Sequence, residues 1–308
     1  MYVKIQFNKS AKGKLMKKIT ILLLALFASF YVYSQDSATG DVMNNYTITS
    51  YFGDTRGDHF HTGIDLAAVG EFAYSLLDSE IIFHNSKKNR DINYGLGNFV
   101  ILQSQDNNYR INYSHLSDDH LDYNKKKYKR AEKLALVGNT GHSTGSHLHL
   151  EIEDLKNKRI LNPLSFLKTS DKLSPVINDA FFKTGEGEII SFFKNSRLKR
   201  GGKLYISAFD RLNNISSIMT PYMFKVIIGG EEAATVKFDY LRKSDNNLFL
   251  SDTNLKFEDI YSGGTENEYF LMDFNSLPGL VGFHIITEDF YGNKTEIRKA
   301  FRILPPDI

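Results

Sequence analysis

Four histidines and one aspartate in three short segments could bind a metal ion and move protons. The segments are His-Thr-Gly-Ile-Asp at residues 61–65, Tyr-Ser-His-Leu at 113–116 and His-Leu-His-Leu-Glu at 147–151. Zinc in proteins prefers histidine nitrogen and carboxylate oxygen, and a catalytic zinc has three protein ligands and one open position. Eight of the nine histidines lie between His59 and His149, which a random scatter over 308 residues would rarely produce.

The spacing of the first segment suits a shared metal ion. His61 and Asp65 are four residues apart, and Gly63 between them permits a tight backbone, so both side chains can converge on one point. A third ligand must come from elsewhere, and His147 and His149 are both candidates. Neighbours on one strand face are about 6.6 Å apart, so one can bind the metal while the other stands beside its bound water.

Residues 147–153 have the clearest strand pattern in the chain. The pattern places His147, His149, Glu151 and Glu153 on one face and Leu148, Leu150 and Ile152 on the other. A period of two predicts that both histidines lie on the same side of a sheet and that the leucine side is buried. His115, at the end of its own strand-like run, can complete the other side of the site.

The first half of the chain, residues 51–170, is predicted to be a domain of short strands. Strand-like runs bounded by Gly, Asn, Asp or Ser occur at 81–83, 98–102 and 110–113, with strong turn signals at 94–98 and 138–141. Long helical periodicity is absent here. We expect residues 121–130, rich in Lys and Tyr, to be a solvated loop.

Asn162-Pro163 and residues 169–175 mark a boundary, and residues 175–308 are again strand-rich. Runs at 203–209, 223–228, 234–240, 268–273 and 282–287 predict an antiparallel β-sandwich. Two similar strand-like segments end in the pairs Asp210/Asn214 and Asp289/Asn293. These pairs could indicate a calcium site, but we interpret them as turns, because Asp and Asn favour turn geometry. No chemistry is expected in this half.

The N-terminus predicts export. Lys17-Lys18 precedes an apolar run of 15 residues, which is short for a membrane span of roughly 20 and fits a secretory signal over residues 1–34. An uncleaved anchor is the alternative. Met16 starts a better-proportioned signal, so residues 1–15 could be a start-site artefact. Residues 35–50 form a polar lead, and whether they cover the metal site is open.

Composition narrows the classes of partner. The chain has 38 Lys and Arg residues and 36 acidic residues. Six lysines and no acidic residue lie in residues 1–34, so the rest of the chain has 32 basic and 36 acidic residues and a net charge of −4. No basic patch is left for nucleic acid. The absence of cysteine excludes disulfides and a lipid-anchored cysteine. The protein must therefore be stabilised by its core.

Over residues 50–167 the chain resembles the lysostaphin-type (LytM-like) zinc endopeptidases that cut the peptides of peptidoglycan. The matching motifs are His-Thr-Gly-Ile-Asp at 61–65, Tyr-Gly-Leu-Gly-Asn at 94–98, Tyr-Ser-His-Leu at 113–116 and the run from Gly138 to Ile152. The resemblance implies that His61, Asp65 and His149 bind Zn²⁺ and that His115 and His147 are catalytic. It also implies a two-layer, mostly antiparallel sheet with the site in a groove.

Three residues depart from the family pattern, and none is at an expected ligand or catalytic position. Ser146 replaces a usual proline, Leu150 replaces a usual phenylalanine and Ser79 replaces a frequent glycine. Residues 175–308 resemble the immunoglobulin-like sandwiches attached to some of these peptidases. The sequence thus predicts a mostly β protein, with a zinc endopeptidase domain at 51–170 and a sandwich domain at 175–308.

The predicted function is hydrolysis of peptidoglycan cross-links by an exported enzyme, through attack of a zinc-activated water. We expect it in the periplasm or cell envelope, with secretion as the alternative, and with an envelope protein as a partner of the sandwich domain. Two other functions stay open: a non-catalytic activator or scaffold on the same fold, and a zinc peptidase for another protein substrate. The bond cut and the roles within the His115 and His147 pair are not decided.

Overall fold

The computed structural model describes residues 42–85, 95–117, 122, 124–199, 201–212 and 217–305. The predicted signal at 1–34 and the first part of the polar lead lie outside the described residues. The described residues all belong to one contact unit, Gly40–Ile308. Within them, no helix has the length and apolar character that crossing a membrane would need.

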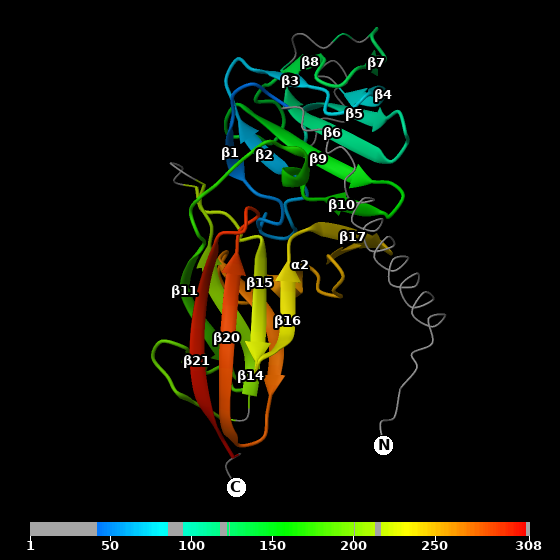
Figure 1. Ribbon diagram of the computed structural model, residues 1–308. Helices are drawn as coiled ribbons and strands as arrows, with labels where there is room; N and C mark the ends of the chain where they lie inside the picture. The colour runs from blue at the N-terminus through cyan, green and yellow to red at the C-terminus, as the bar shows by residue number, and fades with distance from the viewer. Residues whose placement is uncertain are drawn as a thin grey trace, which may run out of the picture. The chain divides into compact units, whose positions relative to one another are not determined.

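The metal-binding motifs lie in a sheet that has ten strands among the described residues (Figure 1). Its main path is β18-β17-β10-β9-β6-β5-β4-β7, while β2 pairs with β9 and β1 pairs with β2. The bounds are β1 Thr47–Ser50, β2 Ile64–Ala67, β4 Ser79–Asn85, β5 Asn98–Ser104, β6 Tyr109–Leu116, β7 Lys127–Tyr128, β9 His147–Asp154, β10 Arg159–Leu161, β17 Tyr240–Ser244 and β18 Asn247–Leu250. A separate ribbon pairs β3 (Phe72–Tyr74) with β8 (Lys133–Leu136).

Strand β9 is the centre of this sheet. One edge pairs with β6, and the other pairs first with β2 and then with β10. The three apolar side chains Leu148, Leu150 and Ile152 are fully buried. The alternation predicted for residues 147–153 is therefore confirmed, and burial of its apolar face fixes which side carries the histidines.

The second half is a sandwich of two sheets. One has the order β12-β11-β14-β19 and the other β13-β21-β20-β15-β16. The bounds are β11 Val176–Lys183, β12 Ile189–Ser191, β13 Arg197–Lys199, β14 Gly201–Phe209, β15 Met223–Ile228, β16 Glu231–Lys237, β19 Glu268–Asn275, β20 Gly279–Glu288 and β21 Lys294–Leu304, with a 3₁₀ turn η1 at Pro163–Phe166 and a short helix α2 at Phe257–Ile260. The predicted fold class, an antiparallel-sheet peptidase domain followed by a sandwich, is confirmed.

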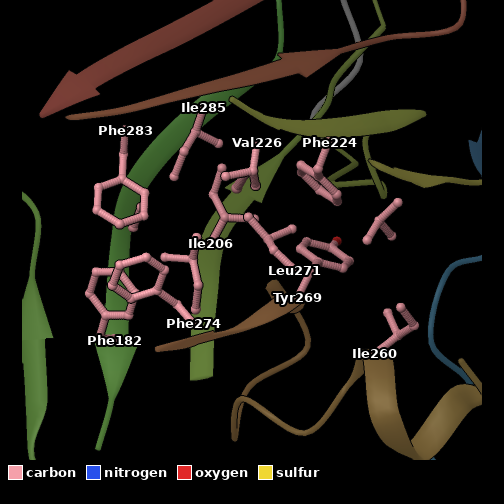
Figure 2. Packing of buried hydrophobic residues seen from close by; sticks show 14 of the residues in the cluster. Phe182, Ile206, Phe224, Val226, Ile260, Tyr269, Leu271, Phe274, Phe283 and Ile285 are labelled. Atoms are coloured by element: carbon pink, nitrogen blue, oxygen red, sulfur yellow. The ribbon is translucent and has the colours of Figure 1, made fainter. Parts of the chain in front are cut away.

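Aromatic and aliphatic side chains fill the space between the two sheets of the sandwich. Figure 2 shows Phe182, Phe274 and Phe283 packed together, and their ring centroids are 4.9–5.5 Å apart. The same buried cluster includes Phe52 and Phe60, which come from the segment just before the first metal-binding motif. The core of the sandwich therefore also holds the residues that lead into that motif.

The structure divides one predicted strand. The run at 234–240 was expected to be continuous, but β16 ends at Lys237 and β17 begins at Tyr240. Asn162 is buried at the bend. Its side-chain Nδ2 donates to the carbonyl of Phe238 at 2.9 Å, and its backbone amide donates to the carbonyl of Asp239 at 3.0 Å. Strand β17 then pairs with β10, so the second half of the chain extends the sheet of the first half.

The prediction of a solvated loop at residues 121–130 is confirmed for most of its described residues, which are exposed, but it is wrong at Tyr128. Lys127–Tyr128 forms β7, which pairs with β4, and the Tyr128 side chain is 2% exposed in the core of the first half.

Phe60 offers a test of how far the core supports the metal-binding segment. Its ring is 1% exposed and packs edge-on against Phe238 and Phe257, at centroid distances of 6.5 and 5.4 Å. Phe60→Ala should lower the free energy of unfolding by about 3–5 kcal/mol, because a large buried ring leaves a cavity. Phe193→Ala, at a ring that is 58% exposed, should change it by less than about 0.5 kcal/mol. Urea denaturation measures both, and equal losses would contradict the packing described here.

Candidate metal centre

Strand register brings the predicted metal-binding residues together. In the β2–β9 pair, Asp65 lies directly opposite His149. On the other edge of β9, Ser114 lies opposite His149, which places His115 next to the same point. Side chains opposite one another across an antiparallel pair are close enough to interact.

Three ligand atoms of His61, Asp65 and His149 converge. His61 Nε2 is 3.2 Å and His149 Nδ1 is 3.0 Å from Asp65 Oδ1, and the two nitrogens are 3.0 Å apart. A tetrahedral zinc with bonds of about 2.0–2.1 Å separates its ligand atoms by roughly 3.3 Å. Two imidazole nitrogens and one carboxylate oxygen at these separations therefore fit a single zinc ion.

The backbone orients His61. Its Nδ1 lies 2.7 Å from the carbonyl oxygen of Tyr51 and 3.2 Å from Oγ of Ser50, so this nitrogen carries the proton and donates. Nε2 is then left unprotonated toward Asp65 and His149. Burial holds the pKa of His61 below its usual value, which keeps the ring neutral. A neutral imidazole is the form that binds a metal.

Arg56 is a functional residue that the sequence did not point to. Its Nη2 donates to Asp65 Oδ2 at 2.6 Å and to Ser50 Oγ at 3.1 Å, which leaves Oδ1 of Asp65 for the metal. Burial alone raises the pKa of Asp65, but its contacts with His149 and His61 outweigh that effect, so the net pKa is well below its ordinary range. Arg56 lies in an irregular loop, where no periodicity connects it with Asp65.

Gly63 makes room for the third ligand. A Cβ atom at this position would lie 2.5 Å from the carbonyl oxygen of Leu150 and 2.7 Å from Cε1 of His149. Glycine at this position therefore allows the backbone before β2 to approach β9 closely. This role adds to the tight backbone that the sequence predicted.

His115 and His147 form a second pair beside the metal-binding atoms. Their ring centroids are 4.6 Å apart, and the His115 ring is 6.1 Å from that of His149. Nδ1 of His115 donates to the carbonyl of Thr140 at 2.8 Å, and Nδ1 of His147 to the carbonyl of Gly145 at 2.9 Å. In the neutral form of each ring, these hydrogen bonds place the proton on Nδ1 and leave Nε2 free to accept one.

Two motif loops hold His115 in place. Its φ of 61° is in the left-handed region, which a residue other than glycine adopts only where its surroundings impose it. Oγ1 of Thr140 donates to the carbonyl of Leu116 at 2.8 Å and accepts from the backbone amide of Asn98 at 2.9 Å. A Cβ on Gly97 would meet the Thr140 backbone at 2.4 Å, so the 94–98 and 138–141 loops require glycine to pack this closely.

Burial lowers the pKa of His115 to about 4, and the neighbouring His147 and His149 add to the effect. The hydrogen bond to Thr140 opposes this shift and is outweighed. The ring is therefore neutral at neutral pH and can accept a proton at Nε2.

The other polar residues near the motifs have separate roles. Oγ1 of Thr62 donates to Oε2 of Glu151, so Glu151 supports the first motif. Glu153 pairs with Arg110 at 3.1 Å and Lys243 at 2.7 Å, away from the ligand atoms. His59 pairs with the exposed Asp58. His120 lies outside the described residues.

Comparison with known proteins agrees with this geometry. Residues 59–163 match the model of peptidase family M23, and a second family model matches residues 174–303. An uncharacterized metalloprotease of Buchnera aphidicola is 32% identical over 138 residues, 42% of this chain and 34% of that protein. The peptidoglycan DD-endopeptidase ShyA of Vibrio cholerae is 36% identical over 93 residues, 30% of this chain and 20% of that protein.

Among solved structures, the catalytic domain of lysostaphin from Staphylococcus simulans is 27% identical, covering 40% of this chain and 92% of that one, with a TM-score of 0.33. The chain spans about a third or less of the length of the two curated relatives.

The convergent His–Asp–His atoms with an adjacent pair of histidines are those of a metallopeptidase domain. More narrowly, the chain carries a domain of peptidase family M23. The resemblance to lysostaphin-type, LytM-like peptidases is confirmed for this domain, and so is zinc as its cofactor, which the three ligand atoms fit.

Gly63→Ala should weaken zinc binding by about 10–100-fold, the loss typical when the support of a ligand is disturbed, because its Cβ would displace the His149 ring. Competition with a chromogenic chelator measures the affinity. Gly185→Ala is the matched control, since nothing lies within 4 Å of its added Cβ. Unchanged zinc affinity in Gly63→Ala would show that the close approach of β2 to β9 does not position the ligand.

Proposed function

We propose that this protein is an exported zinc endopeptidase that hydrolyses the peptide cross-links of peptidoglycan. The observation that carries the proposal is the completeness of the site. His61, Asp65 and His149 supply the ligand atoms, and His115 and His147 stand beside them, each held at Nδ1 by a main-chain carbonyl.

In this proposal His61, Asp65 and His149 hold the metal. Bound zinc supplies a Lewis acid that polarises the scissile carbonyl and lowers the pKa of a coordinated water. Arg56 holds Asp65 by its outer oxygen, and the Tyr51 carbonyl holds His61 by Nδ1. These contacts fix the ligand side chains before substrate arrives.

The histidine pair handles protons. His115 and His147 are held at Nδ1 by the carbonyls of Thr140 and Gly145, so Nε2 is the atom that accepts the proton of the attacking water. The low pKa of His115 keeps that ring neutral before the reaction. The protonated member of the pair then donates to the departing amine, and both histidines are placed for either role.

Substrate and compartment rest on other observations. The N-terminal signal pattern supports export to the periplasm or envelope. The similarity to a peptidoglycan DD-endopeptidase supports peptidoglycan as the substrate. A scaffold role is less well supported, because no ligand or histidine position is lost. Contact of the sandwich domain with an envelope protein stays a prediction.

Digestion of purified peptidoglycan tests the substrate. Zinc-loaded protein should convert cross-linked dimers to monomers, a chelator should abolish the conversion and added zinc should restore it. Mass spectrometry of the released fragments follows the reaction and identifies the bond cut. Intact dimers after incubation with fully zinc-loaded protein would contradict peptidoglycan as the substrate.

His149→Ala and His115→Ala should separate metal binding from proton transfer. The first should lose zinc and activity together. The second should retain zinc and lose about 10²–10⁴-fold in turnover, the usual contribution of a positioned acid or base. Elemental analysis and the dimer assay measure both. His284→Ala is the control, since Nε2 of His284 lies 2.7 Å from Oε2 of Glu296 in the sandwich. Equal zinc loss in both variants would overturn the proposed roles.

A further inference from the structure

Three buried carboxylates cluster away from the zinc ligands. Asp171 lies in the segment after η1, Asp210 follows β14 directly and Asp289 follows β20 directly. One ligand oxygen from each lies within 4.8 Å of the others. Their exposed fractions are 7%, 1% and 1%. Three such charges in the interior are costly unless a counter-charge or a proton balances them.

Asp210 is the member that most needs a partner. Neither of its carboxylate oxygens has a hydrogen-bond partner among the described residues. The amide of Arg211 favours the charged form of Asp210, but its geometry falls short of a normal hydrogen bond. None of the ion pairs in the described part of the chain involves Asp210 or Asp289. Burial, with Asp289 and Asp171 nearby, raises the pKa of Asp210 to about 8.

A buried hydroxyl faces the same charges. Tyr51 is 4% exposed and its hydroxyl has no hydrogen-bond partner among the described residues. Burial is the main cause of its raised pKa, and the charges of Asp210 and Asp171 add to it. Two separate side chains, one carboxylate and one phenol, thus leave polar oxygens unsatisfied at one place, which is unusual in a protein interior.

The remaining two carboxylates are already oriented. Oδ1 of Asp289 accepts from the amides of Tyr291 and Asn293, at 2.9 and 2.8 Å. Oδ1 of Asp171 accepts from the amide of Leu173 at 3.3 Å. The turn interpretation of Asp289 is therefore correct. For Asp210 the turn interpretation is not tested, because its supposed partner Asn214 lies outside the described residues; the Asp210 carboxylate itself accepts no hydrogen bond among the described residues.

We propose that Asp171, Asp210 and Asp289 form a calcium site, with the Tyr51 hydroxyl at its edge. All candidate ligand atoms are oxygens, the choice of hard cations, and no imidazole or thiolate is present to favour zinc. Calcium accepts irregular sets of oxygens at 2.3–2.6 Å, whereas magnesium demands a near-ideal octahedron and gives up its water reluctantly.

The ion would join parts of the chain that converge only in the fold. Asp171 belongs to the connection between the two halves, and Asp210 and Asp289 belong to the sandwich. Tyr51 belongs to the segment whose carbonyl orients His61. Calcium is therefore expected to stabilise the whole protein and to steady one zinc ligand. This inference does not depend on the peptidase activity proposed above.

Calorimetric titration of zinc-loaded, calcium-free protein with CaCl₂ tests the site. We expect one calcium per chain, a dissociation constant of about 1 mM or tighter, and at least tenfold weaker binding of magnesium. The midpoint of thermal unfolding should rise by several degrees in calcium. Asp210→Asn should abolish both effects without changing the zinc content. Asp273→Asn, at an exposed aspartate of β19, should leave both unchanged.

Absence of binding and of thermal stabilisation in the wild-type protein at about 10 mM calcium would overturn the proposal, since even weak extracellular sites bind below that level. Wild-type calcium affinity in Asp210→Asn, or equal binding of magnesium, would also overturn it. If Asp210→Asn does not fold, Asp171→Asn replaces it in the same titration, with the same two outcomes.

Discussion

The pairing of β2 with β9 is the constraint on which the metal centre depends. Because side chains alternate along a strand, a shift of one residue would turn His149 into the core and bring a leucine to the surface. Complete burial of Leu148 and Leu150 makes that shift costly, and the register is therefore fixed by the core rather than by the metal. With Asp65 opposite His149 in this register, the remaining contacts only need to adjust side-chain orientation.

Main-chain carbonyls control the histidines. Tyr51, Thr140 and Gly145 each accept a hydrogen bond from Nδ1 of one ring. A carbonyl does not titrate, so it keeps its acceptor role at any working pH, which a carboxylate partner would not. This arrangement also leaves Asp65 as the acidic group at the centre of the site, and Arg56 supplies its counter-charge. Asp210 is also buried, but its carboxylate has no hydrogen-bond partner among the described residues. This difference from Asp65 points to a bound cation at Asp210, in addition to zinc.

Much of the centre could be predicted from the sequence because its information is local. The alternation in 147–153 places both histidines on one face, and Gly63 between His61 and Asp65 indicates a tight segment. Other features had no local signal. Tyr128 follows a run of lysines that suggested solvent, but pairing with β4 buries its ring. Strand β17 gives no sign in its own residues that it will extend the sheet of the other half.

The sequence by itself determined the chemistry: which residue types are present, their order, and the strand periods that put them on particular faces. Tertiary structure alone decided the partners. Arg56 reaches Asp65 through an irregular loop, and Asp171, Asp210 and Asp289 meet from three separate segments. The physical reason is that periodicity specifies the face of an element, whereas contact between elements depends on register and packing over the whole core.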